Sequence, residues 1–300
     1  MTPLPRLSTL FEAAPDAATS GATLPARLRE LYGGELRFPP PGLRPYVFCN
    51  FVSTLDGVVS FALPGQAGGG AISGGDAGDR FVMGLLRAAA DAIIVGAGTL
   101  REVPADALFR PEQTCPEAKP LYDAYRNAML GRREPPLLVV VSGSGRLDLD
   151  HAVFRTPGVP ALIFTTAAGG LALTRAGAAR LDSVEVRVLP AGALPPRAAP
   201  QAMLDMLQRE FQVRRLLHEG GPHLIGEFLR AGLLDEMFLT LAPQIAGRGH
   251  GPGGLERLGL AAGAVFQPAT APWWRLLSVK SSGEFLYLRY GIKPGAEPES

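Results

Sequence analysis

Apolar runs of strand length alternate along the chain with segments in which apolar residues recur at helical spacing. The run 46–53 is continuous, which is typical of a strand that is buried on both faces. Further strands are predicted at 92–96, 137–141, 161–165, 184–190, 213–219 and 235–243, and helices at 79–91, 173–181, 201–211 and 222–232. Because strands that alternate with helices are joined by parallel crossovers, the pattern predicts an α/β sheet that is covered on both faces.

The two ends of the chain carry a different pattern. Residues 1–44 are rich in Pro, Ala and Gly, and we expect an N-terminal arm with one short helix that packs on the surface or on a partner subunit. Residues 273–290 are predicted to form an antiparallel hairpin, and the polar residues 293–300 a disordered tail. The domain 45–292 is therefore expected to hold a single mixed, mostly parallel sheet with helices on both faces and a C-terminal antiparallel hairpin.

The apolar hairpin also bears on the oligomeric state. A hairpin at the end of a sheet would leave an exposed strand edge, which proteins usually cover. A second copy of the chain could supply that cover, so the pattern favours a homodimer.

Composition narrows the class of protein. The chain has 300 residues, 47% of them hydrophobic, and a formal net charge of +1, so its charge does not point to a nucleic acid partner. Cys49 and Cys115 form no C-x-x-C pair, and His218 and His223 have no further His or Cys at ligand spacing, so no metal site is expected. We see neither a signal peptide nor an apolar stretch of about 18 residues, and we expect a cytoplasmic protein with no membrane partner.

The most informative strand end lies before the helix that opens at Pro222. Glu219, Gly220 and Gly221 stand there, at the carboxyl end of the predicted strand 213–219. The first N–H groups of a helix are unpaired and carry the positive end of its dipole, so glycines at this point would let a pyrophosphate approach the backbone. The alternative is a glycine turn that only packs the helix against the strand.

A second strand end carries two glycines and a hydroxyl group. Gly96, Gly98 and Thr99 follow the run 92–96, but Arg101 occupies the last glycine position of the G-x-G-x-x-G pattern. A classical dinucleotide fold is therefore weakly supported. The residue types nevertheless suit contact with a phosphate or a ribose.

Two more strand ends carry polar groups. Asp56 lies in an Asp-Gly turn after the first strand, and Ser142, Ser144 and Arg146 follow the strand 137–141. Asp56 could simply cap its own turn, and the serine cluster could be an ordinary polar loop or could hold the extra phosphate of NADPH. Four such strand ends that converge on one sheet edge would form a dinucleotide cleft.

Three stretches together resemble the reductase domain of riboflavin biosynthesis, which is the C-terminal domain family of bacterial bifunctional deaminase-reductases and has a dihydrofolate-reductase-like fold. The stretches are "RPYVFCNFVSTLDG", "ISGGDAGDRFVMGLLRAAADAIIVGAGTLRE" and "LLHEGGPHLIGEFLRAGLLDEMFLTLAPQIAG", and the resemblance covers roughly 44–290. It implies a homodimeric, NADPH-dependent pyrimidine reductase. Its substrate would be a small phosphorylated heterocycle, a phosphoribosylamino-pyrimidinedione whose ribosyl group is reduced to ribityl.

The resemblance also implies roles for individual residues. Arg87 and Arg110 match substrate arginines, which suit a phosphomonoester, and Glu219 matches a glutamate that faces the substrate. Asp56 or Glu219 is expected to be catalytic and to assist proton movement, and the sequence does not choose between them. The implied cofactor-binding residues are Ser53, Gly96, Gly98, Thr99, Ser142, Ser144, Arg146, Thr165, Gly220, Gly221, Pro222, His223 and Leu224.

The chain also departs from this family. It lacks the H-x-E and P-C-x-x-C signatures of a zinc deaminase, the segment 113–134 looks like an insertion, and the acidic-acidic-proline stretch after Thr99 is replaced. Two alternatives stay open. One is a reductase of the same fold that acts on a pteridine or another heterocycle, and the other is a catalytically silent NADPH-binding protein.

Overall fold

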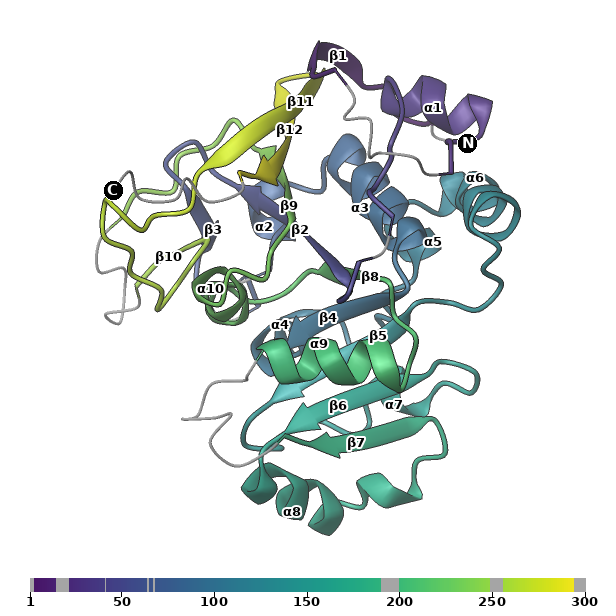
Figure 1. Cartoon of the computed structure of the whole chain (residues 1–300), viewed down its shortest axis with the longest axis vertical. Coiled ribbons are helices and arrows are strands. Elements are labelled where there is room, and N and C mark those ends of the chain that lie inside the picture. The colour runs from purple at the N-terminus through teal and green to yellow at the C-terminus, as the bar shows by residue number, and fades with distance from the viewer. Residues whose placement is uncertain are drawn as a thin grey trace.

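The computed structural model describes residues 3–14, 22–40, 42–63, 65–66, 68–189, 200–248 and 256–293, so the predicted tail lies outside the described residues beyond position 293. One sheet runs through the molecule in the strand order β1-β11-β12-β9-β2-β8-β4-β5-β6-β7 (Figure 1). The strands are β1 (Ser8–Glu12), β2 (Tyr46–Ser53), β4 (Ala92–Gly96), β5 (Leu137–Ser142), β6 (Ala161–Thr165), β7 (Val184–Val188), β8 (Arg215–His218), β9 (Glu236–Leu241), β11 (Trp274–Ser282) and β12 (Phe285–Ile292). A separate small sheet joins β3 (Val58–Ser60) to β10 (Leu258–Gly259).

The direction of the strands confirms the predicted fold class. From β9 to β7, neighbouring strands of the large sheet are parallel. The C-terminal hairpin of β11 and β12 continues the sheet with antiparallel pairing, as predicted.

Helices cover both faces of the sheet, and alternate side chains of the central strands enter one of two cores. On β2, Phe48 belongs to the core that holds α1 and α3, whereas Val47 and Cys49 belong to the core that holds α9 and α10. Burial raises the pKa of the Cys49 thiol, in keeping with a structural role.

The helices are α1 (Ala26–Tyr32), α2 (Gly70–Ser73), α3 (Ala77–Ala89), α4 (Ala97–Glu102), α5 (Pro111–Thr114), α6 (Lys119–Asp123), α7 (Ala152–Arg155), α8 (Ala167–Arg175), α9 (Pro200–Arg209) and α10 (Pro222–Arg230), with 3₁₀ turns at Pro116–Ala118 and Ala178–Arg180 and a π-helix at Ala124–Met129.

The region before Pro45 contributes a strand to the sheet. β1 pairs antiparallel with β11 and so covers the free edge of the C-terminal hairpin. The ammonium of Lys280 on β11 is 1% exposed and donates to Glu12 Oε2 at 3.0 Å and to the carbonyl oxygen of Gly33 at 2.9 Å. The structural reason for expecting a homodimer is therefore wrong, because the chain covers this edge itself. The homodimer stays a prediction.

The segment 113–134 is packed into the core. The hydroxyl of Tyr122 donates to the carbonyl oxygen of Phe81 at 2.8 Å, and Arg126 donates to the carbonyl oxygens of Ala88 and Ala90 at 3.2 and 2.6 Å. The bonds from Arg126 satisfy carbonyl groups at the C-terminal end of α3, where helix carbonyls lack partners within the helix, and the bond from Tyr122 reaches the N-terminal half of that helix. The segment thus holds α3 in place.

One helix differs from its predicted position. The sequence pattern placed a helix at 173–181, but α8 begins at Ala167 because the hydroxyl of Thr166 accepts from Gly169 N at 3.0 Å and caps its first turn. It ends before Gly177, whose φ of +86° breaks the helix.

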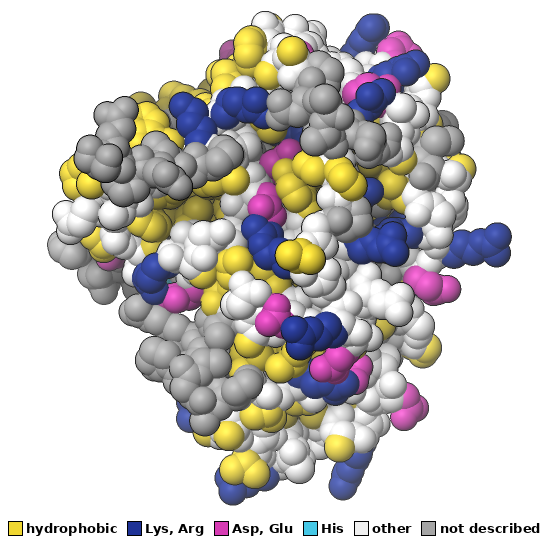
Figure 2. All heavy atoms as spheres, in the orientation of Figure 1, with side chains coloured by type: hydrophobic (Ala, Val, Ile, Leu, Met, Phe, Trp, Pro, Cys, Tyr) yellow, Lys and Arg dark blue, Asp and Glu magenta, His cyan; other side chains and the backbone are white. Residues whose placement is uncertain are grey.

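The surface carries charges of both signs. Lys and Arg side chains alternate with Asp and Glu side chains over the face in Figure 2, in keeping with the net charge of +1. Within the described ranges, no helix is long and apolar enough to cross a bilayer.

Candidate active site

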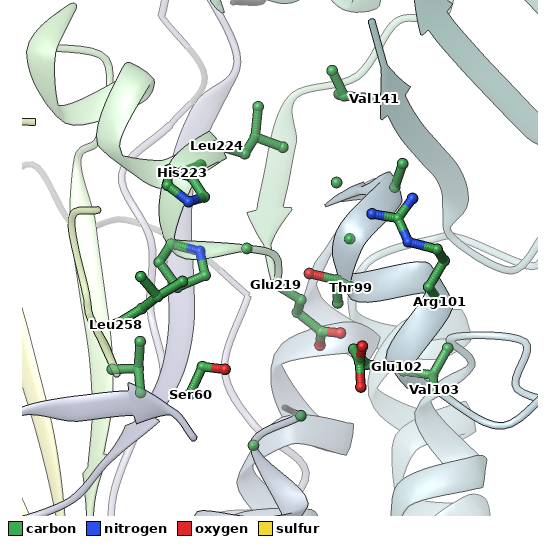
Figure 3. Close-up of a pocket in the computed structure, with 18 of the residues that line it drawn as sticks. Ser60, Thr99, Arg101, Glu102, Val103, Val141, Glu219, His223, Leu224 and Leu258 are labelled. Carbon is green, nitrogen blue, oxygen red and sulfur yellow. The ribbon is translucent and has the colours of Figure 1, made fainter. Parts of the chain in front are cut away.

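A cavity of about 1190 Å³ opens at the carboxyl edge of the parallel strands. Open α/β sheets bind ligands at this edge. Figure 3 shows Thr99 and Arg101 of α4 on one side of the cavity, Glu219 after β8, and His223 and Leu258 across from them. Of the residues predicted for a site, those that line it are Arg87, Gly96, Gly98, Thr99, Ser142, Ser144, Thr165, Glu219, Gly221, Pro222, His223 and Leu224.

Arg87 and Glu219 form a bidentate ion pair in the wall of the cavity. Arg87 Nε donates to Glu219 Oε1 at 2.8 Å and Arg87 Nη2 to Glu219 Oε2 at 2.7 Å, and the two side chains are only 10% and 6% exposed. The guanidinium also lies over the ring of Phe109, 5.2 Å from its centroid. Arg87, for which the resemblance implies a role at the substrate, is therefore paired with Glu219 and fixes the orientation of that carboxylate.

The two glycines after Glu219 have different roles. A Cβ at Gly220 would lie 3.0 Å from both Thr99 Oγ1 and Val95 Cα, so Gly220 allows close packing on β4 and α4. Gly221 lines the cavity at φ +60°, a conformation that favours glycine, and only Thr99 Oγ1 would lie near its Cβ. His218 Nδ1 accepts from Gly220 N at 3.3 Å, and burial lowers the pKa of this imidazole to about 3, which keeps it a neutral acceptor. Packing thus explains Gly220, and access to the cavity explains Gly221.

Asp56 is not among the residues that line the cavity. Its Oδ1 accepts from the hydroxyl of Thr54 at 2.6 Å and its Oδ2 from Gly247 N at 2.7 Å. The bond from Thr54, followed by that from Ala246 N, lowers the pKa of this carboxyl to about 2. The turn-capping interpretation of Asp56 is therefore favoured over the catalytic one.

Four other predicted residues are also absent from the cavity wall: Ser53, Arg110, Arg146 and Gly220. The hydroxyl of Ser53 donates to the carbonyl oxygen of Thr54 at 2.8 Å. The carbonyl oxygen of Arg110 accepts from Arg87 Nη1 at 3.4 Å, so it is the backbone of Arg110 that supports the site. Arg146 is exposed, and its backbone N donates to Ser144 Oγ at 3.3 Å.

Several polar residues line the cavity that the sequence did not single out for a site, among them Asn50, Asp79 and Arg101. Asn50 of β2 is 8% exposed and its Oδ1 has no partner, Asp79 of α3 is 3% exposed, and Arg101 of α4 forms no ion pair within the described part of the chain. Asn50 lies in an apolar run and Asp79 at the start of a predicted helix, and neither position marks a site residue in the sequence. Arg101 appeared only as a break in a glycine pattern.

The cavity wall carries groups that could bind a cofactor. Gly98, Gly221, Ser142 and Thr165 line it together with Glu219, and the buried Ser142 Oγ has no hydrogen-bond partner among the described residues. A buried hydroxyl without a partner costs free energy, which a ligand that accepts or donates a hydrogen bond can recover. Within the described ranges, no cluster of three or more His, Cys, Asp or Glu side chains could hold a metal ion.

Comparisons with known proteins agree with this geometry. Residues 45–286 match the model of the RibD C-terminal domain. The chain belongs to the RibD C-terminal domain family. A curated relative from Archaeoglobus fulgidus, the 2,5-diamino-6-ribosylamino-4(3H)-pyrimidinone 5′-phosphate reductase, is 31% identical over 70% of this chain and 85% of its own length. These matches confirm the predicted family and the predicted enzyme class, a reductase of the pyrimidine reductase type.

Solved structures confirm the fold of the family. A pyrimidine reductase-like protein from Corynebacterium diphtheriae has a TM-score of 0.63 at 22% identity, covering 84% of this chain and 93% of that one. A deaminase/reductase from Thermotoga maritima has a TM-score of 0.56 at 20% identity, covering 83% of this chain and 57% of that longer one.

Proposed function

We propose that this chain is an NADPH-dependent reductase that converts the ribosyl group of a phosphoribosylamino-pyrimidine to ribityl in riboflavin biosynthesis. The observation that carries the proposal is the convergence of Thr99, Gly221 and the paired Glu219 on one cavity. The Archaeoglobus relative, a reductase of a ribosylamino-pyrimidinone 5′-phosphate, supports the substrate class.

The residues of the cavity divide between cofactor and substrate. Thr99, Gly221 and Ser142 would hold the dinucleotide, which supplies a hydride when bound. Glu219 is fixed by Arg87, so its remaining lone pairs can accept hydrogen bonds from the ribose hydroxyls of the substrate. Holding the ribosyl carbon in one position accounts for several kcal/mol of the barrier in reactions of this kind.

The proposal is tested by following NADPH oxidation in the presence of the phosphoribosylamino-pyrimidine. Turnover is expected with this substrate and not with a pteridine. Turnover of the pteridine alone would replace the proposed substrate, and NADPH binding without turnover of either compound would favour the silent binding protein.

Glu219→Gln is expected to lower turnover at least tenfold, about 1.4 kcal/mol, and to leave NADPH affinity within about twofold. The amide keeps the shape of the side chain but removes the charge that orients the ribose hydroxyls. The measurements are kcat and the dissociation constant of NADPH from fluorescence quenching.

Glu236→Gln is the matched control for this variant. Glu236 also forms a buried bidentate pair, with Arg289 at 2.9 Å through both oxygens, but it does not line the cavity. Both variants should lose stability, and only Glu219→Gln should lose turnover per folded molecule. Equal turnover losses would mean that Glu219 acts only through stability.

Arg101→Ala is expected to weaken NADPH binding at least tenfold and to leave NADH binding nearly unchanged. Arg101 is the arginine of the cavity wall that has no carboxylate partner among the described residues, and it extends into the cavity on the side of Val141 (Figure 3). A charge-assisted bond to the 2′-phosphate is worth about 1.5–3 kcal/mol. Arg146→Ala distinguishes the two candidate sites for the 2′-phosphate, Arg101 and the loop 142–146. If only Arg146→Ala weakens NADPH binding, the phosphate binds at the loop.

A further inference from the structure

The inner wall of the cavity carries a carboxyl group to which neither a cofactor-binding nor a substrate-binding role has been given. Asp79 lies in the first turn of α3, is 3% exposed and lines the cavity. The hydroxyls of Thr240 on β9 and Ser73 on α2 form hydrogen bonds with its carboxyl group. No Lys or Arg of the described chain forms an ion pair with it. Burial without a cation nearby favours the protonated form of a carboxyl group.

The charged groups around Asp79 act in the same direction. Burial raises the pKa of this carboxyl to about 6, and the carboxylates of Asp76 and Glu219 add to the increase, whereas the bond from Thr240 opposes it. Tyr287 of β12 also faces this cluster, and its hydroxyl donates to Asp76 Oδ1 at 2.5 Å. Asp79 therefore keeps its proton at pH values where an ordinary aspartate is already ionised, up to about pH 6.

The other carboxyl groups considered for proton transfer are less suitable. Both oxygens of Glu219 accept hydrogen bonds from the guanidinium of Arg87. Asp56 lies outside the cavity wall and its oxygens accept from Thr54 and from backbone N–H groups. Asp79 is therefore a third candidate beside the two residues between which the sequence did not choose.

We propose that Asp79 is the proton donor of the reaction and protonates the ring oxygen of the ribosyl group as the sugar ring opens. The C1′–O4′ bond breaks, its electron pair stays on O4′ and takes the proton of Asp79, and the lone pair of the exocyclic nitrogen forms the C=N bond. The positive charge on the resulting iminium ion is balanced by the Asp79 carboxylate. Hydride addition at C1′ then returns the electron pair to nitrogen, and Asp79 regains its proton from water. This inference rests on the proposed function.

The test compares kcat of the wild type and of Asp79→Asn from about pH 5 to about pH 9. The wild-type kcat should fall as pH rises and Asp79 loses its proton. Asp79→Asn should reduce kcat at least ~100-fold, abolish that pH dependence and leave the dissociation constant of NADPH within about twofold. Glu219→Gln is the matched control from the same cavity, since it should lower kcat and still show a fall of kcat with rising pH. That fall should move to lower pH, because the Glu219 carboxylate helps to raise the pKa of Asp79.

Thr240→Val gives a second variant that keeps the carboxyl group. It removes the hydrogen bond that lowers the pKa of Asp79, so the fall of kcat should move to higher pH. An Asp79→Asn enzyme with wild-type kcat, or one whose kcat is reduced but retains the same pH dependence, overturns the role of Asp79 and leaves the proposed function standing. A wild-type chain that fails to turn over the pyrimidine at any pH overturns both.

Discussion

Arg87→Met is expected to lower the free energy of unfolding by about 3–5 kcal/mol, the usual cost of removing one partner of a buried ion pair. Methionine fills a similar volume, but it leaves the Glu219 carboxylate, 6% exposed, without its two charge-assisted hydrogen bonds. Domains of this kind are stable by about 5–15 kcal/mol, so the variant should have a strongly reduced urea midpoint. The measurement is urea unfolding followed by circular dichroism.

Two further variants decide whether the unpaired charge is the cause. Arg87→Met combined with Glu219→Gln should recover much of the loss, because the remaining amide is neutral. Arg289→Met is the matched control, since Arg289 makes the same bidentate contact with Glu236 away from the cavity. It should cost a similar amount of stability without a specific loss of turnover. A single Arg87→Met variant as stable as the wild type would contradict the assignment of the pair.

Asp79→Asn is expected to gain stability relative to the wild type as pH rises. The pKa of Asp79 is raised from 3.8 to about 6, so the native state binds the proton more tightly than the unfolded chain. The stability that this provides is present at low pH and is lost as pH rises through about 6. Because asparagine does not ionise, the difference in unfolding free energy should shift in favour of the variant by up to about 3 kcal/mol between about pH 4 and about pH 7.

The measurement is the unfolding free energy of both proteins at several pH values. Subtracting the two curves removes the contribution of all other titrating groups that the variant leaves unchanged. A difference that does not vary with pH would mean that Asp79 ionises as readily in the folded chain as in the unfolded one. A gain of stability at neutral pH together with a loss of turnover would show that Asp79 is retained for function at a cost in stability.

The sequence predicted the central part of the fold well because those strands carry their own signal. The strands β2, β4, β5 and β6 are apolar runs, and all lie where the runs were found. β1 was missed because its five residues are exposed in the structure and show no apolar pattern. Its position depends on pairing with β11, about 270 residues later, and local propensity contains no information about that contact.

The candidate site was predicted in outline and not in its internal contacts. Glycines and hydroxyls at strand ends identified the cavity, since parallel strands bring those ends together. The pairing of Arg87 with Glu219 was missed, because nothing in the sequence shows that two charges 132 positions apart form an ion pair. Asp79 resembled an ordinary acidic residue at a helix start, and only the strands packed over it, β9 and β12, reveal a buried carboxyl group.

Lys280 sets a limit on how this chain can be divided for expression. Its ammonium donates hydrogen bonds to Thr9, Glu12 and Gly33 and lies over the ring of Tyr32. Within the described chain, all of these partners come from residues 9–33. The segment that matches the family model begins at residue 45. A fragment cut at that boundary would keep the buried cation and discard its partners, so the unit defined by similarity is smaller than the unit that can fold without penalty.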